Sequence, residues 1–434
     1  MKSRCILAIV SIVCSSLIAG CDRAVTNTAS TAISPSCEVA LAPAGARDEN
    51  VREIVDLKQR LRESPRDGRA LERLGYRYVA RARVTNDPGD YTLAEKTAEC
   101  MASINGDDPA ALLLRGHALH QMHRFAEAEQ IARRLTAQRE FVLDYGLLGD
   151  SLMDQGRLTD AAVAYQKMID LKPFYQSYTR AAHIRWLKGD LAGAHQMIEQ
   201  AIKAASRRDP ESIAWAYTRL ATYELQRGRL SHASAAVDAA LQYQPEYAAA
   251  LLARGRVLLA MKRPAESIEP LRRAATLNPL PEYEWALADA LRLLKRDREA
   301  AEVEAALETR GAASDPRTLA LFLATRGSDL ERAITLAHAE SQVRGDVFTL
   351  DAVAWTLAAA GRTGEARDVM TRALAEGTAD ARLFLHAAAI HAEADRPAEA
   401  RRWLQKVEDV RSTLLPSELD ALASVRSRVA GSAN

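Results

Sequence analysis

The sequence predicts an all-α solenoid built from antiparallel helix pairs. A small residue recurs along the chain with a second small residue twelve places later and a proline twelve places after that. Clear copies are Gly149 with Ala161 and Pro173, Ala221 with Ala233 and Pro245, and Gly255 with Ser267 and Pro279. The 434 residues are 48% hydrophobic but only 5% aromatic, which suits many short helices in close contact. A fixed period of this kind marks a repeat array rather than one globular core.

Residues 1–20 have the pattern of a secretory signal peptide. Two basic residues precede a mostly apolar run that is too short for an ordinary membrane-crossing helix. The run ends in Ile18-Ala19-Gly20-Cys21, which resembles the lipobox of bacterial lipoproteins. That resemblance implies cleavage before Cys21, lipidation of its sulfur and stable attachment to a lipid bilayer through several acyl chains. The alternative is an unmodified signal peptide whose cysteine is coincidental.

The residue after Cys21 bears on the membrane that holds the protein. Asp22 at this place resembles the inner-membrane retention signal of enterobacterial lipoproteins. We therefore expect a lipid-anchored protein at the cell membrane that faces the periplasm, with the inner membrane favoured over the outer membrane.

Residues 21–47 are rich in Thr, Ala, Ser and Pro, so we expect a flexible tether after the lipidated cysteine. This assignment leaves Cys37 in the tether and Cys100 in the first repeat. An oxidising periplasm permits a disulfide between them, but two unrelated thiols fit the sequence equally well. Within residues 48–67, apolar side chains return at helical spacing, which predicts a lead-in helix against the first repeat.

The repeats span residues 68–413 in about ten copies. In the best copy, Gly149 and Ala161 mark where the two helices approach most closely, because only small side chains allow that distance. Gly156 can take the positive φ that ends a helix, and Pro173 cannot continue one. The pattern resembles the tetratricopeptide repeat. That resemblance implies a right-handed superhelical solenoid in which the first helix of each pair lines a concave groove.

Residues 414–434 carry apolar side chains on one helical face and charges on another. Stacked repeats leave an unpartnered apolar face at each end of the array. We therefore expect a capping helix over the last repeat, followed by a short tail.

Several classes of function find no support in the sequence. The chain has 58 Lys and Arg against 57 Asp and Glu, so no excess of positive charge favours nucleic acid. No phosphate-binding loop, His-Glu-x-x-His, Cys-x-x-Cys or Gly-x-Ser-x-Gly motif occurs, and we expect neither an enzyme nor a cofactor. His117, His120 and His123 have a spacing that could hold a metal, but we interpret them as solvated helix histidines and predict no metal site.

The predicted groove is the candidate site for partners. Helical periodicity places in it Arg180, His183, Trp186, Trp215, Arg219, Arg256, Trp285 and Arg292. Trp and Arg dominate binding hot spots, and the arginines make the middle of the groove basic, which favours an acidic peptide or a terminal carboxylate. The alternatives are tryptophans that fill the seams between repeats and arginines that are merely solvated. The Lys and Asn residues of the carboxylate clamp known from this family are missing.

The sequence thus predicts a membrane-anchored scaffold that binds partner proteins or peptides of the cell envelope through its groove. Assembly or export of envelope components is the process that the resemblance suggests. A glycan or small-ligand binding protein that uses the groove tryptophans is the alternative, since aromatic rings stack on sugars.

Overall fold

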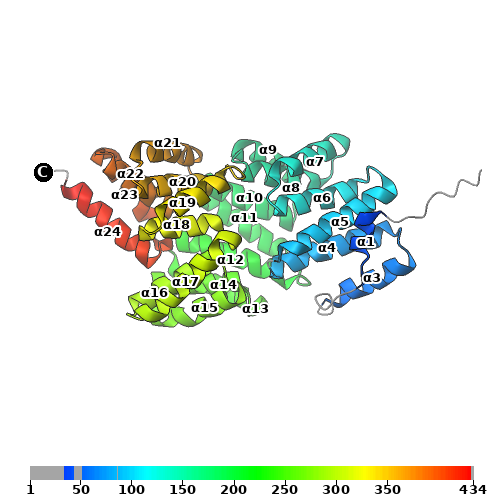
Figure 1. The fold of residues 1–434 in the computed structure, drawn as a ribbon, viewed down its shortest axis with the longest axis horizontal. Helices are drawn as coiled ribbons and strands as arrows, with labels where there is room; N and C mark the ends of the chain where they lie inside the picture. Colours follow the sequence, from blue (N-terminus) through cyan, green and yellow to red (C-terminus); the bar gives the residue numbers. More distant parts are fainter. Residues whose placement is uncertain (1–33, 44–50, 86, 432–434) are drawn as a thin grey trace, which may run out of the picture.

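The computed structural model of the chain describes residues 34–43, 51–85 and 87–431. These residues form 23 α-helices and two short 3₁₀ helices, and they contain no strand. The described part of the chain is therefore all-α, as predicted (Figure 1). The predicted signal peptide and lipidation site lie outside the described residues. None of the helices in this part of the chain is long and apolar enough to cross a membrane.

Ten antiparallel helix pairs follow one another along the described chain. The first helices are α4 (Gly68–Thr85), α6 (Pro109–Gln121), α8 (Val142–Asp154), α10 (Tyr175–Leu187), α12 (Pro210–Gln226), α14 (Ala248–Ala260), α16 (Pro281–Leu293), α18 (Pro316–Arg326), α20 (Val347–Ala359) and α22 (Ala381–Glu393). The second helices are α5 (Pro88–Asn105), α7 (Phe125–Gln138), α9 (Leu158–Leu171), α11 (Leu191–Ala204), α13 (Leu230–Tyr243), α15 (Pro264–Leu277), α17 (Asp297–Ser314), α19 (Leu330–Ser341), α21 (Thr363–Ala373) and α23 (Pro397–Val410). Each first helix packs against its second helix and against the next pair.

Local sequence explains the geometry of a pair. A β-carbon at Gly149 of α8 would overlap the ring of Tyr165 on α9, so the glycine is required for the close approach of the two helices. Gly156 then ends the first helix with φ at 80°, a conformation that other residues rarely adopt. At helix starts, aspartates cap free amide groups, as where the Asp108 carboxylate accepts from the backbone nitrogen of Ala110 at 2.9 Å.

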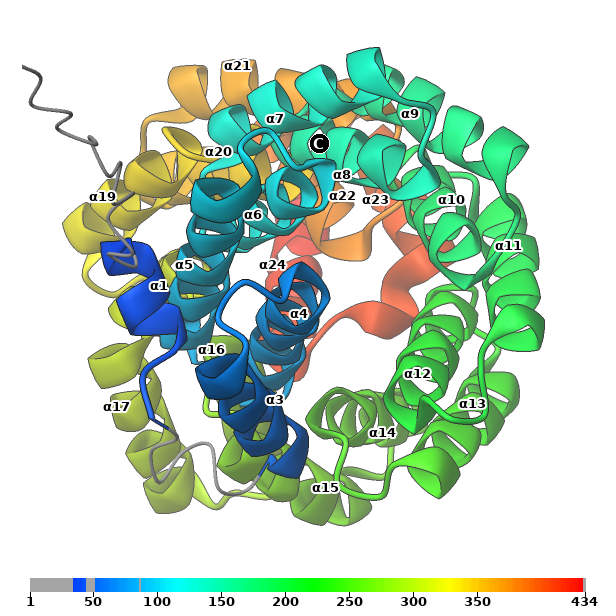
Figure 2. The same ribbon diagram turned by 90° about the vertical axis from the view of Figure 1, so that its right-hand side faces the viewer.

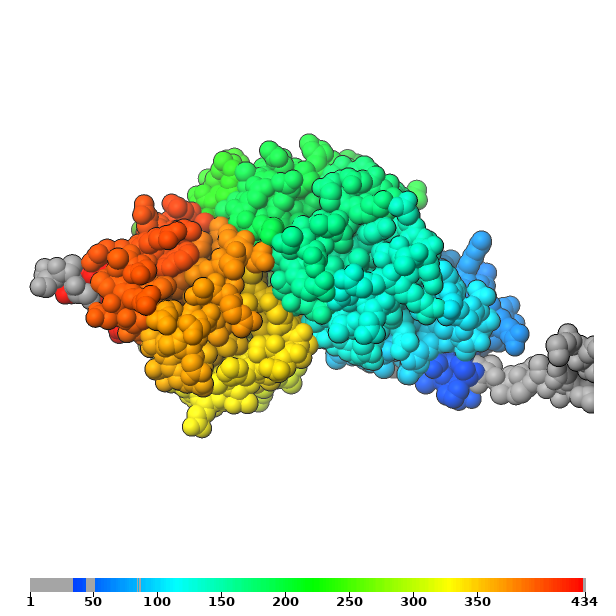
Figure 3. Space-filling view, turned by 90° about the horizontal axis from the view of Figure 1, so that it is seen from above, coloured from blue at the N-terminus to red at the C-terminus, as the bar shows by residue number. Residues whose placement is uncertain are grey.

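The array closes on itself, so its two halves touch. The turn after α8 contacts the linker before α20, which begins six pairs later, and the backbone nitrogen of Gly345 donates to the Asp154 carbonyl at 3.1 Å. The turn after α10 contacts the linker before α22, where Lys188 pairs with Glu376 at 2.8 Å. We call the contacts of residues 154–156 and 187–189 with residues 344–345 and 376–379 the inter-turn seam. Figure 2 views the resulting ring end-on, and Figure 3 shows the two halves in contact.

The N-terminal segment differs from the expected flexible tether. Residues 35–40, inside the range predicted as tether, form the helix α1 (Pro35–Ala40), which packs against α5. A disulfide joins Cys37 of α1 to Cys100 of α5, and both cysteines are buried. This link fixes a segment that is too short and too polar to order itself. The lead-in helix is α3 (Arg52–Glu63), whose apolar face packs on α4.

The C-terminal helix α24 (Pro416–Gly431) does more than cap the last pair. It packs against α22 and α23, as a cap would, but it also contacts α16 and α18 across the inside of the ring. A 3₁₀ helix, η2 (Arg411–Thr413), precedes it and contacts α12 and α14. Because the solenoid has curved round, the end of the chain meets the inner face of earlier repeats.

Candidate functional site

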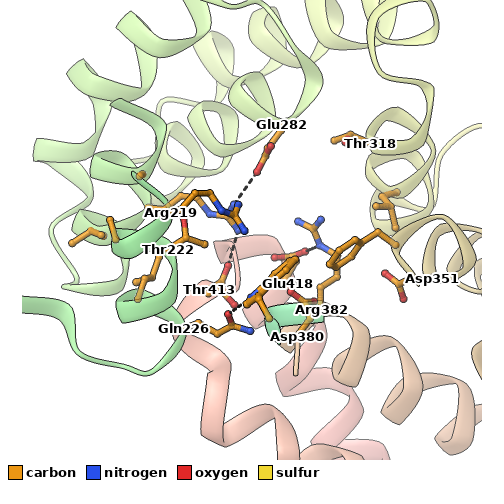
Figure 4. Close-up of a pocket in the computed structure, with 18 of the residues that line it drawn as sticks. Arg219, Thr222, Gln226, Glu282, Thr318, Asp351, Asp380, Arg382, Thr413 and Glu418 are labelled. Atoms are coloured by element: carbon orange, nitrogen blue, oxygen red, sulfur yellow. Dashed lines mark hydrogen bonds and ion pairs between the residues drawn. The ribbon is translucent and has the colours of Figure 1, made fainter. Parts of the chain in front are cut away.

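The inner face of the ring contains a cavity of about 230 Å³. Its walls come from first helices of successive pairs, from α24 and from the linkers before α22 and α24 (Figure 4). The lining residues are Trp186, Arg219, Ala221, Thr222, Leu225, Gln226, Ala253, Arg256, Val257, Glu282, Arg317, Thr318, Leu321, Phe348, Asp351, Asp380, Arg382, Thr413 and Glu418. The predicted groove is therefore, in this part of the array, a partly open pocket. The second half of the array forms one of its walls.

Arg219 is the charged residue of the cavity whose hydrogen-bonding capacity is least used. Its guanidinium lies 5.2 Å from the ring centre of Trp186 and 5.3 Å from that of Tyr223. Its Nε and Nη2 atoms are buried and have no hydrogen-bond partner among the described residues. Burying N–H donors without acceptors lowers the stability of the folded protein. The paired N–H groups of a guanidinium can donate to both oxygens of a carboxylate. Arg219 is thus the natural anchor for an anionic group.

Arg256 faces the same cavity but is largely engaged. Its Nη1 pairs with Glu282 at 2.9 Å, and its Nη2 donates to the Thr413 carbonyl at 2.9 Å. Only its Nε is buried without a partner among the described residues. Arg256 therefore holds the C-terminal segment in place.

The carboxylates of the cavity are also engaged. Glu418 forms an ion pair with Arg382, and although burial raises the pKa of Glu418, this guanidinium lowers that pKa below its ordinary value. Asp351 lies 2.9 Å from the His386 ring nitrogen. Asp380 accepts from the first turn of α22, and burial raises the pKa of this carboxyl. The negative groups of the wall thus have partners, whereas Nε and Nη2 of Arg219 have no hydrogen-bond acceptor among the described residues.

The tryptophans are not open anchors, which corrects the sequence-based expectation. Trp186 lines the cavity but is only 9% exposed, and its ring stacks on His183 and Phe348. Trp285 is 1% exposed in the core, and half-buried Trp215 packs against the same core. A helix has faces toward its partner helix and toward the next pair, and a small error in register moves a side chain between these faces.

The remaining predicted site residues do not line the cavity. Arg180 forms an ion pair with Asp150 at 2.6 Å, and Arg292 forms one with Glu304. His183 lies behind Trp186. Of the eight predicted groove residues, the structure gathers Trp186, Arg219 and Arg256 around one cavity.

Two histidines on first helices, His117 and His183, have lowered pKa values. The pKa values of His117 and His183 are lowered to about 4, chiefly by burial and also by Arg180 and Arg219 respectively. Both histidines are half-buried, so His117 is less solvated than expected. Among the described residues, no group of His, Cys, Asp and Glu could hold a metal ion.

We expect the protein to lose stability on acidification. Because the unfolded histidines titrate near 6.5, the folded chain binds fewer protons than the unfolded chain between about pH 6.5 and pH 4. The stabilisation is complete above this window and is lost as pH falls through it, by roughly 2 kcal/mol per histidine at about pH 5. Urea unfolding of the wild type and of the double variant His117→Asn, His183→Asn checks this. Equal pH slopes for the two proteins would contradict it.

Sequence reasoning missed the far wall of the cavity. Arg382, Asp380 and Glu418 lie in the last part of the chain, and Arg317 lies in the first turn of α18. These residues lie at or near the starts of first helices and of α24, and that position could have marked them as candidates for the inner face. What the sequence did not show is that these helices return to face α12.

Comparisons with known proteins agree with the repeat pattern. The family model of the tetratricopeptide repeat matches residues 113–176 and 218–280. No curated protein sequence matches the chain.

Several solved structures are similar in part. A tetratricopeptide repeat protein of Thermus thermophilus is 20% identical over 44% of this chain and 99% of its own, with a TM-score of 0.39. PilF of Pseudomonas aeruginosa is 20% identical over 48% of this chain and 94% of its own, with a TM-score of 0.36. A tetratricopeptide repeat protein of Parabacteroides merdae is 15% identical over 60% of this chain and 99% of its own, with a TM-score of 0.35. This all-α solenoid therefore contains tetratricopeptide repeats, at residues 113–176 and 218–280.

Proposed function

We propose that this protein is a membrane-anchored scaffold that binds acidic peptide segments of envelope proteins in its inner cavity. The observation that carries the proposal is Arg219, whose buried Nε and Nη2 lack acceptors among the described residues. The carboxylates around it already have partners, so the cavity lacks a negative group rather than a positive one. A peptide carboxylate, from an acidic side chain or a chain end, would supply it.

Replacing Arg219 with Gln should weaken the binding of acidic peptides by roughly tenfold or more, because hydrogen bonds to a charged group contribute about 1.5–3 kcal/mol. Isothermal titration calorimetry with acidic peptides, each with a free or an amidated C-terminus, measures the loss and shows which carboxylate is bound. The matched control is Arg298→Gln, which removes a guanidinium whose side chain is 93% exposed. Equal dissociation constants for the wild type and the Arg219 variant would refute the proposed site.

The alternative of glycan binding gains no support from the positions of the indoles. Sugar stacking needs an open ring face, but Trp186 is buried and stacks on His183 and Phe348, and Trp355 stacks on His386 with ring centres 4.1 Å apart. We therefore keep the peptide as the proposed ligand. Assembly or export of envelope components is the proposed context.

The proposed anchor is lipidated Cys21 in a membrane that faces the periplasm, with the inner membrane favoured. Two features support this: the lipobox-like Ile18-Ala19-Gly20-Cys21, and the buried disulfide between Cys37 and Cys100. Structural disulfides form and persist in oxidising compartments such as the periplasm.

Replacing Cys21 with Ser should move the protein from the membrane fraction to the soluble fraction, because the acyl acceptor is lost. Labelling with a palmitate analogue and fractionation measure this change. Cys14→Ser removes a leader cysteine and should change neither result. Labelled, membrane-bound Cys21→Ser protein would show that the anchor lies elsewhere.

A further inference from the structure

The C-terminal segment Arg411–Glu418 lies on the inner face of the earlier repeats in the way a bound peptide would. The Arg256 guanidinium of α14 donates to the main-chain carbonyl of Thr413 at 2.9 Å. The Gln226 side chain of α12 similarly donates to the Ala379 carbonyl in the linker before α22. Main-chain groups of the end of the chain are thus recognised by side chains far away in sequence.

Ser417 is the most firmly held residue of this segment. Its hydroxyl and its backbone nitrogen both donate to the same oxygen of Asp289 on α16, at 2.6 and 2.8 Å. The indole Nε1 of Trp285 donates to the Ser417 hydroxyl at 3.2 Å. Asp289 is 2% exposed, and burial raises the pKa of its carboxyl. The other oxygen of Asp289 pairs with Arg326 of α18 at 2.7 Å, so the repeats fix the carboxylate that Ser417 contacts. A fixed, buried acceptor that takes two hydrogen bonds from one residue indicates specific recognition rather than general capping.

The segment also borders the space proposed for a partner. Thr413 and Glu418 form part of the cavity wall that Arg219 faces. Two side chains of the segment, Leu414 and Leu415, are buried in the core, and its contacts with α14 and α16 are polar. Terminal segments open more readily than the interior of a fold. Release of this segment would widen the cavity and free Arg256.

We propose that residues 411–418 are an internal ligand of the inner face of α12, α14 and α16, and that an acidic partner peptide displaces them. The identity of the displacing peptide rests on the proposed function. The internal occupation of the inner face rests on the contacts of Arg256, Asp289 and Trp285 alone. The partner therefore enlarges a site that the chain partly fills by itself until the partner arrives.

The test uses the full chain with Ser417→Ala, which removes the hydroxyl bonds to Asp289 and Trp285. Ser427→Ala is the matched control, because the exposed Ser427 hydroxyl of the same helix bonds only within α24, to the Ala423 carbonyl. Hydrogen exchange of the amides of residues 411–431 should be roughly tenfold faster in Ser417→Ala than in wild type or control. The acidic peptides should bind Ser417→Ala several-fold more tightly than wild type.

A synthetic peptide with the sequence of residues 409–421 separates this inference from the proposed function. It should bind Ser417→Ala and compete with the acidic peptides, and it should bind wild type weakly. If it binds Ser417→Ala while no acidic peptide binds either protein, the internal ligand stands and the proposed function falls. If it does not bind Ser417→Ala while acidic peptides bind both proteins equally, the segment is only a cap and the inference is overturned. Unchanged exchange in Ser417→Ala would overturn it as well.

Discussion

Replacing Gly156 with Ala is expected to destabilise the folded array by about 3 kcal/mol or more, because two costs combine. The residue has φ at 80°, where a β-carbon is strained. That β-carbon would also overlap the carbonyl oxygen of Gly345, which belongs to the backbone of the second half. A flexible side chain could move aside, but backbone on both sides of the inter-turn seam cannot, so the seam must open.

Gly361→Ala is the matched control for this prediction. Gly361 occupies the same place after α20, with φ at 76°, but its β-carbon would meet nothing within 4 Å. It should therefore show only the conformational cost, about 1 kcal/mol. Thermal and urea unfolding give the two losses, and hydrogen exchange of residues 344–346 reports whether the seam has opened. Equal losses in the two variants would mean that the seam contributes nothing to stability.

The parts of the fold that could be predicted from the sequence are local. Gly149 fits against Tyr165 because one helix of a pair meets its neighbour within about 20 residues, and the spacing of small residues encodes that contact directly. Gly156 at a helix end follows from backbone sterics alone. The all-α class and the succession of pairs follow from these same local rules.

The closure of the ring could not be predicted, because it accumulates over many pairs. Each pair adds a small rotation, and the sum over six pairs decides whether Gly345 meets Gly156 or passes it. No single residue determines the total rotation. For the same reason the predicted cap, α24, was placed at the end of the array and not across α16.

The candidate site shows the same division between local and accumulated geometry. The period correctly indicated that Arg219 and Arg256 stand on first helices, which is why both line the cavity. It did not indicate that Arg256 would donate a hydrogen bond to the Thr413 carbonyl. Nor did it indicate that Nε and Nη2 of Arg219 would have no acceptor among the described residues. The charges that decide the ligand are therefore set by contacts between residues far apart in the chain, such as the separation of 157 between Arg256 and Thr413.

Removing the disulfide, by Cys37→Ala with Cys100→Ala, is expected to cost about 4 kcal/mol in the N-terminal part of the array, because the bond closes a loop of 63 residues. The loss should be local: amides of α1, α3 and α4 should exchange faster, while those of α14 and α16 should not change. Reductant should produce the same shift in wild type and none in the double variant. Unchanged exchange in α1 would mean that packing against α5 alone holds it. A loss of the expected size would mean that the stability of this region depends on an oxidising compartment. The attachment of α1 to α5 would then also depend on that compartment, and α1 is the described segment nearest to Cys21.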